Sequence, residues 1–182
     1  MRLVLLGAPG SGKGTQGALL AQRLGVPLVS TGELLRAHAA RGTDLGRQVA
    51  GYLNRGDLVP DDLILAVVGD ALSDAAMTAG GYVLDGFPRT VAQAHFTDAL
   101  APPEAVIHLA LPDEVARRRL AQRTGDDRSD DTRADVVERR LGHFHAETEP
   151  LLEFYRQRGT LRTVDGNQPP EAVSAAILEA LD

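Results

Sequence analysis

The sequence contains no cysteine, which excludes disulfide bonds and metal sites built from thiolates. It also lacks any segment that approaches the roughly 18 consecutive apolar residues of a membrane-spanning helix. The N-terminus opens directly into an apolar run that predicts a strand and not a cleavable signal. We therefore expect a cytoplasmic protein with no membrane partner.

Basic residues are in the minority, because 19 Lys and Arg stand against 25 Asp and Glu and give a net charge of −6. This balance argues against a general nucleic-acid surface, so no nucleic-acid partner is expected. Lysine is nearly absent: Lys13 is the only one, and every other basic residue is arginine. The exception suggests that this position needs a slim point charge where the planar fork of arginine would not fit.

The length of 182 residues suits one well-buried core with small appended lobes, and nothing in the sequence requires a dimer, so a monomer is expected. Helical patterns alternate with short apolar runs at residues 3–6, 26–29, 82–85, 105–111 and 161–164. Strands that alternate with helices predict an α/β fold whose parallel sheet is covered on both faces.

Residues 7–15 read Gly-Ala-Pro-Gly-Ser-Gly-Lys-Gly-Thr, between the first predicted strand and a helical pattern. The spacing from Gly7 to Gly12 and Lys13 offers unobstructed backbone N–H groups, the positive end of a helix and one ammonium group. A glycine cluster alone would indicate only a tight turn. Strand, loop, lysine and helix together predict a phosphate-binding loop.

Several polar residues in the sequence are best explained by local structure. Ser30 and Glu33 have the spacing of a capping box, and Asp61 or Asp62 is expected to cap a later helix. Thr90 is expected to cap the helix that follows it. His108 lies within a predicted interior strand and is interpreted as a core or strand-edge residue with no catalytic role.

Two further features bear on phosphate chemistry. Asp85 ends a predicted buried strand, where a carboxylate either manages Mg²⁺ or begins a turn. Between residues 117 and 140, eight arginines accompany six carboxylates. Solvated helix faces explain some of these arginines, and a clamp on polyphosphate would explain the rest.

Six motifs in order resemble the adenylate kinase family over essentially the full length of the chain. They are the loop at 7–15 followed by Gln16, residues 30–36, residues 56–60, residues 84–89 with Gln93, Arg128 with Asp130 and Asp131, and Arg140 with Leu141. The resemblance implies a P-loop three-layer α/β/α fold with a five-stranded parallel sheet. It also implies a single kinase domain over residues 1–182, with a helical NMP-binding insertion at about 30–59 and a short lid at about 124–134.

The resemblance implies two nucleotide sites. ATP would be bound by Gly10, Ser11, Gly12, Lys13, Gly14, Thr15, Arg119, Arg123 and Gly166. AMP would be bound by Thr31, Arg36, Asp57, Leu58, Val59, Gly86, Phe87, Pro88, Arg89, Gln93, Arg128 and Arg140. The catalytic cations would be Lys13, Arg89, Arg123, Arg128 and Arg140. Gln93 would read the adenine edge of AMP.

Three features distinguish this sequence within the family or from other phosphate-loop proteins. Gly14 stands where other phosphate loops have Ser or Thr, which implies that phosphate oxygens and water hold Mg²⁺, with Asp85 contacting the ion through water. The spacing from Arg128 to Arg140 is one residue longer than usual, so Arg139 remains an alternative to Arg140. The lid is short and has no cysteine, as in family members without zinc.

The implied activity is the reversible, Mg²⁺-dependent conversion of ATP and AMP to two ADP, in adenine nucleotide homeostasis. The alternatives are a kinase for UMP, CMP or another nucleoside monophosphate, and a nucleotide-binding module without catalysis. Thr31 and Gln93 favour AMP as the acceptor, and the full set of arginines argues against a module that only binds.

Overall fold

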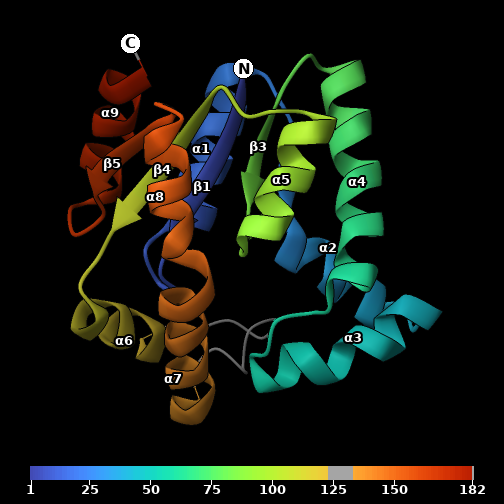
Figure 1. Cartoon of the computed structure of the whole chain (residues 1–182). Helices are drawn as coiled ribbons and strands as arrows, with labels where there is room; N and C mark the ends of the chain where they lie inside the picture. The colour runs from blue at the N-terminus through green and yellow to red at the C-terminus, as the bar shows by residue number, and fades with distance from the viewer. Residues whose placement is uncertain (123–132, 182) are drawn as a thin grey trace.

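The computed structural model describes residues 1–122 and 133–181. Within them the chain forms a sheet of parallel strands in the order β2-β3-β1-β4-β5 (Figure 1). The strands are β1 (Arg2–Gly7), β2 (Leu28–Ser30), β3 (Tyr82–Asp85), β4 (Ala105–Ala110) and β5 (Leu161–Asp165). This arrangement confirms the predicted α/β fold with a five-stranded parallel sheet.

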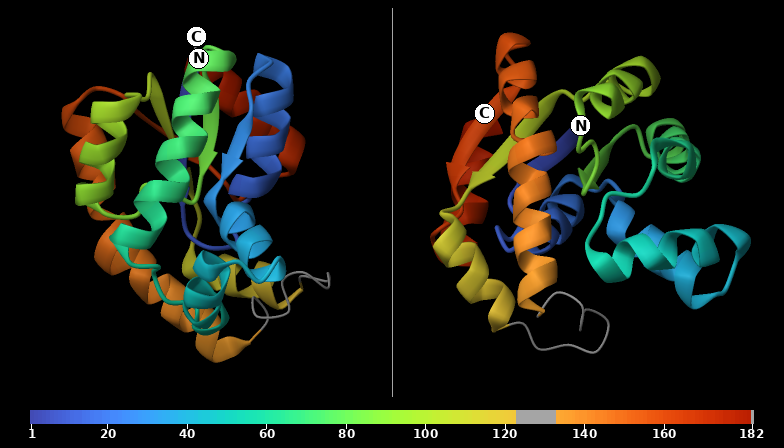
Figure 2. Two further views of the ribbon diagram at one scale, coloured as in Figure 1. Left: turned by 90° about the vertical axis from the view of Figure 1, so that its right-hand side faces the viewer. Right: turned by 60° about the horizontal axis from the view of Figure 1, so that its bottom comes forward.

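The central strand β1 shows how the sheet obtains two covered faces. Val4 and Leu6 enter one core cluster, while Leu3 and Leu5 enter another, because successive side chains of a strand point to opposite faces. Helices α1 (Lys13–Leu24) and α9 (Pro170–Leu181) cover the face of Leu3 and Leu5. Helices α4 (Asp61–Thr78), α5 (Val91–Leu100) and α8 (Pro150–Gln157) cover the other, as Figures 1 and 2 show.

Two helical pairs extend beyond the carboxyl ends of the strands and stand apart in both views (Figures 1 and 2). One pair is α2 (Thr31–Ala40) and α3 (Asp44–Arg55), which lie so close that a Cβ atom on Gly46 would collide with the backbone of His38. The other is α6 (Asp113–Ala121) and α7 (Ala134–His143). They pack through Leu120 and Leu141 in a small core that also includes Ala8 of the loop after β1.

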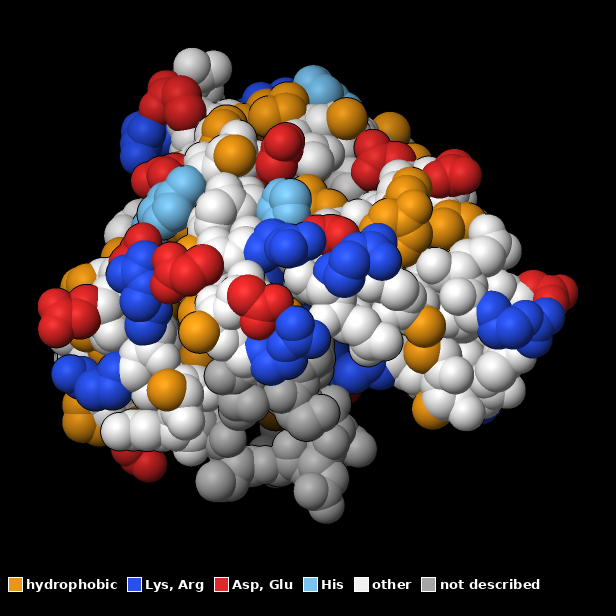
Figure 3. Space-filling view, turned by 90° about the horizontal axis from the view of Figure 1, so that it is seen from below, with side chains coloured by type: hydrophobic (Ala, Val, Ile, Leu, Met, Phe, Trp, Pro, Cys, Tyr) orange, Lys and Arg blue, Asp and Glu red, His pale blue; other side chains and the backbone are white. Residues whose placement is uncertain are grey.

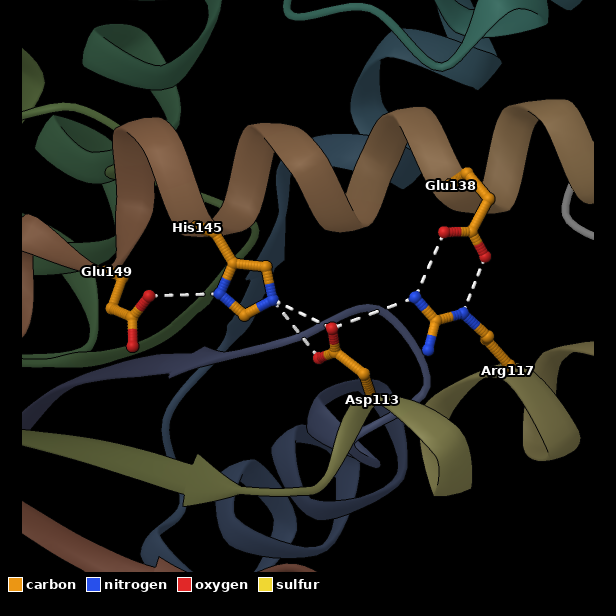
Figure 4. Close-up of polar contacts among 5 residues, drawn as sticks. All are labelled: Asp113, Arg117, Glu138, His145 and Glu149. Carbon is orange, nitrogen blue, oxygen red and sulfur yellow. Dashed lines mark hydrogen bonds and ion pairs between the residues drawn. The ribbon is translucent and has the colours of Figure 1, made fainter.

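A π-helical turn, η2 (Phe144–Thr148), joins α7 to α8, so that a nearly continuous helical path runs from the lower end of the molecule to the sheet. Beside η2, ionic contacts fasten α6 to α7 (Figure 4). Arg117 donates to both carboxylate oxygens of Glu138 at 2.6 and 3.0 Å. The His145 ring lies 3.0 Å from the Asp113 carboxylate and 2.9 Å from that of Glu149. These contacts connect the start of α6 to the junction between α7 and α8.

Of the three predicted helix caps, one is confirmed, one is confirmed in position but not in its hydrogen bond, and one is wrong. Thr90 accepts a hydrogen bond from the backbone N–H of Gln93, as expected. Ser30 occupies the N-cap position of α2, at the end of β2 and opposite Asp85, but its side chain makes no capping hydrogen bond. Pro60, and neither aspartate that follows it, occupies the N-cap of α4.

His108 lies half-buried in β4, between β1 and β5. Burial lowers the pKa of its ring below the ordinary histidine value. The prediction that it sits within an interior strand is confirmed. Among the residues that the structure describes, no helix combines the length and apolar character needed to cross a bilayer.

Candidate functional site

The loop between β1 and α1 has the form expected of a phosphate cradle. Gly7, Gly10 and Gly12 all have positive φ, and Gly12 directly precedes the first helical residue, Lys13. A Cβ atom on Gly7 would fall 2.8 Å from the carbonyl oxygen of Leu109, so this turn requires glycine. The loop thus brings backbone N–H groups and the positive end of α1 to one place.

Lys13 lies over this loop. Its ammonium group donates to the carbonyl oxygens of Gly7 at 2.7 Å and Ala8 at 2.9 Å, and lies 3.5 Å from the hydroxyl of Ser11. These neighbours are oxygen atoms of the loop itself, so the loop holds the ammonium group of Lys13 directly over it.

A cavity opens at the carboxyl ends of the strands, between the loop, the α2–α3 pair and α7. Its lining includes most of the predicted site residues: Gly10, Gly12, Lys13, Gly14, Thr31, Arg36, Asp57, Leu58, Val59, Asp85, Gly86, Pro88, Arg89, Gln93 and Arg140. Side chains of both charge signs cover this end of the molecule, with basic ones frequent among them (Figure 3). The cavity therefore joins both predicted nucleotide sites into one space.

Three arginines, Arg36, Arg89 and Arg140, line the cavity. Arg89 comes from the turn after β3, where its Nε atom donates to the carbonyl oxygen of Gly86 at 2.9 Å. Burial lowers the pKa of Arg89; the nearby carboxylate of Asp85 opposes this shift, and the charges of Arg140 and Arg36 add to it. Cations that repel one another in a shared, partly dehydrated space make a binding site for an anion.

Asp85 lies at the carboxyl end of β3 with its side chain toward the phosphate loop. A Cβ atom built on Gly14 would lie 3.9 Å from its Oδ2 atom. Its Oδ1 atom is buried and has no hydrogen-bond partner among the described residues. A carboxylate oxygen that is buried without a donor is suited to a cation or to a water molecule that a cation holds.

The far end of the cavity is built around the turn after β3. The hydroxyl of Thr31 donates to the carbonyl oxygen of Asp85 at 3.1 Å, which ties the start of α2 to this turn. Gly86 has a φ of +84°, and a Cβ atom there would lie 2.6 Å from that hydroxyl. The amide side chain of Gln93 lines the same end of the cavity.

The two arginines that the sequence left as alternatives point to different places. Arg140 lines the cavity, and its Nη2 atom lies 3.5 Å from the carbonyl oxygen of Leu53. Arg139 instead donates to the carboxylate of Asp57 at 3.2 Å, and nearly half of its side-chain surface remains exposed. Of the two arginines, only Arg140 lines the cavity.

Other predicted site residues lie beside the cavity without lining it. They are Ser11, Thr15, Phe87, Arg119 and Gly166. Arg119 reaches the loop, with its Nη1 atom 3.5 Å from the carbonyl oxygen of Gly10. Gly166 also lies close, since a Cβ atom there would be 3.3 Å from the carbonyl oxygen of Ser11. Arg123 and Arg128 lie outside the described residues, as does most of the predicted lid.

The cavity also has lining residues that sequence reasoning missed. His143, Phe144 and Thr148 come from the end of α7 and from η2. Thr148 donates to the carbonyl oxygen of Arg89 at 3.1 Å and so supports the turn that carries this arginine. His143 follows Arg140 by three residues and therefore shares its helix face. This spacing could have predicted that His143 lines the same cavity.

A phosphate loop on a parallel sheet, with separate arginines facing it across one cavity, defines a P-loop enzyme that transfers phosphoryl groups between nucleotides. The profile of one family, described as "Adenylate kinase", matches residues 5–160. The chain belongs to the adenylate kinase family, whose members are phosphotransferases.

Similarity to individual proteins extends over nearly the whole chain. An adenylate kinase of Thermobifida fusca is 41% identical over 100% of this chain and 98% of its own length. The "Adenylate kinase 1" of a Synechocystis strain is 46% identical over 94% of this chain and 92% of its own. An adenylate kinase of Thermus thermophilus is 42% identical over 98% of this chain and 96% of its own length. The resemblance inferred from the six motifs is thereby confirmed.

Proposed function

We propose that the chain catalyses the reversible reaction of ATP with AMP to give two ADP. The supporting observation is that the Lys13 loop and the Arg36, Arg89 and Arg140 cluster line one cavity. A phosphate held by the loop and a second held by the arginines would meet end to end. An oxygen of the AMP phosphate then bonds to the γ-phosphorus of ATP, while the bond to the β,γ-bridging oxygen breaks and its electron pair leaves with ADP.

The phosphate-loop side is the proposed donor half of the site. Its loop residues Gly10 to Thr15 would hold the ATP phosphates through backbone N–H groups, with Lys13 on the group being transferred. Arg119 and Gly166, which lie close to the loop, would flank the rest of ATP. Arg123 and Arg128 are proposed to approach the phosphates from the lid at 124–134.

The turn after β3 and the insertion at 30–59 form the proposed acceptor half. Arg36 and Arg89 would bind the AMP phosphate, and Arg140 would lie between the two nucleotides. Thr31 and Gln93 would face the base, while the segment 57–59 and the turn 86–88 would enclose the nucleoside. Each of these residues except Phe87 lines the cavity.

The site also suits Mg²⁺ bound to ATP. Asp85 supplies a buried carboxylate oxygen without a hydrogen-bond donor, and Gly14 leaves open the space beside it. Asp85 would hold the ion through water, and Mg²⁺ supplies charge neutralisation on the phosphates when bound. The described residues contain no group of three or more His, Cys, Asp or Glu suited to a metal ion, and the sequence has no cysteine; we propose an enzyme without zinc.

The chemistry explains why cations dominate the site. Two like charges 4 Å apart repel by about 1 kcal/mol in water and by about 4 kcal/mol at an effective dielectric of 20. Closing the insertion and the lid over the nucleotides would exclude water, so ATP would not be hydrolysed and each counter-charge would act more strongly. No general base is required, because the acceptor phosphate is already an anion.

The experiment that tests this function compares acceptors in a coupled assay with ATP and Mg²⁺. AMP should exceed CMP, UMP and GMP in kcat/KM, and a pyrimidine nucleotide that outpaces AMP would overturn the assignment. Arg89→Ala should lower kcat by about 10³-fold, as expected when a cation at the transfer point is removed. The matched control is Arg162→Ala, which removes an exposed arginine of β5 outside the cavity. An unchanged rate in Arg89→Ala would favour a module that binds nucleotides without catalysis.

We further propose that the enzyme acts in the cytoplasm as a monomer. One cavity of one chain brings together the proposed donor and acceptor residues, so a second copy is not needed to complete the site. Sedimentation equilibrium at micromolar concentration should give the mass of a single 19.3 kDa chain.

A further inference from the structure

The side chain of Gln93 is almost completely buried, with 3% of its surface exposed, and both ends of its amide group have partners. Its Oε1 atom accepts a hydrogen bond from the backbone N–H of Arg89 at 2.8 Å. Its Nε2 atom donates to the Oδ1 atom of Asp61 at 2.7 Å. Asp61 begins α4, whereas Gln93 lies in the first turn of α5, so two separate helices meet at this amide.

These two partners permit only one orientation of the amide group. An ionised carboxylate can only accept a hydrogen bond, and a backbone N–H can only donate one. Rotating the amide by 180° would set its oxygen against the carboxylate of Asp61 and its NH₂ group against the N–H of Arg89. The flipped state would therefore lose two hydrogen bonds and gain two repulsive contacts.

The oriented amide keeps one hydrogen of Nε2 and one lone pair of Oε1 for a ligand in the cavity that it lines. A 6-aminopurine presents a donor, its amino group, beside an acceptor, N1. A 6-oxopurine presents the opposite pattern, an acceptor oxygen beside a donor N1–H. An amide that could rotate would match either base, whereas a fixed amide matches only one of them in a given pose.

We propose that Asp61 is a specificity-determining positioning residue, which fixes the amide of Gln93 in the orientation that accepts 6-aminopurine and rejects 6-oxopurine nucleotides. The proposal rests on the proposed function, in which the base of AMP lies beside Gln93. Asp61 acts through Gln93 and has no direct contact with the reacting phosphates. Backbone and phosphate contacts fix the pose of the acceptor nucleotide. Asp61, with the backbone N–H of Arg89, then prevents the amide of Gln93 from rotating to match a 6-oxopurine.

The test compares AMP with inosine monophosphate, in which an oxygen replaces the 6-amino group and N1 carries a proton. The measured quantity is the ratio of the two kcat/KM values with ATP as the donor. Asp61→Asn keeps the shape of the side chain but lets it donate as well as accept. We expect this variant to lower the AMP preference by about tenfold, the order of one hydrogen bond to a charged group, mostly through KM for the acceptor, with kcat for AMP little changed.

Asp62→Asn is the matched control. Asp62 is the next residue in the same first turn of α4, so the two variants lose the same charge at the same helix end. We expect Asp62→Asn to keep the full AMP preference. Equal preferences in the two variants would overturn the proposal, as would an Asp61→Asn enzyme that slows equally with both nucleotides.

Gln93→Ala separates this proposal from the one on which it rests. We expect Gln93→Ala to reduce the AMP preference and Asp61→Asn to reduce it no further in that background. If Gln93→Ala keeps the preference, the base does not lie beside Gln93 and the role of Asp61 is refuted, whereas the proposed function fails only if AMP is not the preferred acceptor of the wild type. If Gln93→Ala loses it but Asp61→Asn does not, the site assignment stands and the role of Asp61 is refuted.

Discussion

Two buried tyrosines differ in whether their hydroxyl groups are hydrogen-bonded, so the same substitution can be compared in both situations. Tyr82 and Tyr155 have 0% and 1% of their surface exposed. The hydroxyl of Tyr82 donates to the carbonyl oxygen of Ala101 at 2.5 Å. The hydroxyl of Tyr155 is buried and has no hydrogen-bond partner among the described residues. Replacing each tyrosine with phenylalanine removes one oxygen atom and leaves the ring in place.

The expected effects have opposite signs. Tyr82→Phe loses a buried hydrogen bond and leaves the oxygen of Ala101 without this donor, which should destabilise the protein by about 1 to 2 kcal/mol. Tyr155→Phe removes a hydroxyl that is dehydrated without compensation, which should stabilise it by about 1 kcal/mol. For a chain of this size, about 2 to 4 °C in Tm corresponds to each kcal/mol. We therefore expect Tyr82→Phe to melt several degrees below the wild type and Tyr155→Phe a few degrees above it.

The measurement is thermal and urea unfolding followed by circular dichroism at pH 7. Burial raises the pKa of both hydroxyls, so both remain protonated at this pH and ionisation does not enter the comparison. A Tyr155→Phe protein that loses as much stability as Tyr82→Phe would refute the reasoning, because the two hydroxyls would then contribute equally.

Three other perturbations test separate parts of the molecule. Asp85→Asn should raise the Mg²⁺ concentration that gives half-maximal activity by about tenfold, measured by titrating Mg²⁺ at fixed ATP; an unchanged midpoint would count against Asp85 as a water-mediated ligand. Gly86→Ala should lower Tm and raise KM for AMP more than KM for ATP, because a Cβ atom there would meet the hydroxyl of Thr31 at a backbone φ of +84°. Hydrogen bonds to two carboxylates raise the pKa of His145, so its stabilisation is full below about pH 6.5 and is lost as pH rises through the raised value. From pH 6 to pH 8, the unfolding free energy of the wild type should fall by about 0.5 kcal/mol more than that of His145→Gln. Urea unfolding of both proteins at the two pH values measures this, and an equal fall in both would contradict it.

The strands and the phosphate loop could be predicted because their signals are local. A buried strand reads as a short apolar run, as at β3, and a phosphate loop reads as glycines of fixed spacing before one lysine. The position of Thr148 could not be predicted in this way. It lies at the end of the π-helical turn between α7 and α8, and its contact with Arg89 joins residues 59 positions apart in the sequence.

Contacts between distant helices were also hidden from the sequence. Asp61 looks like a helix cap, yet Pro60 takes that position and the carboxylate of Asp61 faces Gln93 on another helix. Ser30 and Glu33 have the spacing of a capping box, and Ser30 is the N-cap of α2, but its side chain makes no capping hydrogen bond. For Asp61, a contact with a distant helix takes the place of the local cap that the spacing suggests.

The single lysine gives this enzyme a built-in chemical reporter. Lys13 carries the only ε-amino group of the sequence, and its Nζ atom lies in the cradle at 2.7 Å from the carbonyl oxygen of Gly7. An acylating reagent carried on an ATP-like scaffold would therefore leave one modified side chain, apart from the terminal amine. Competition between that reagent and unlabelled nucleotides, followed as one mass increment on the intact protein, would report occupancy of the proposed donor half without any mutation.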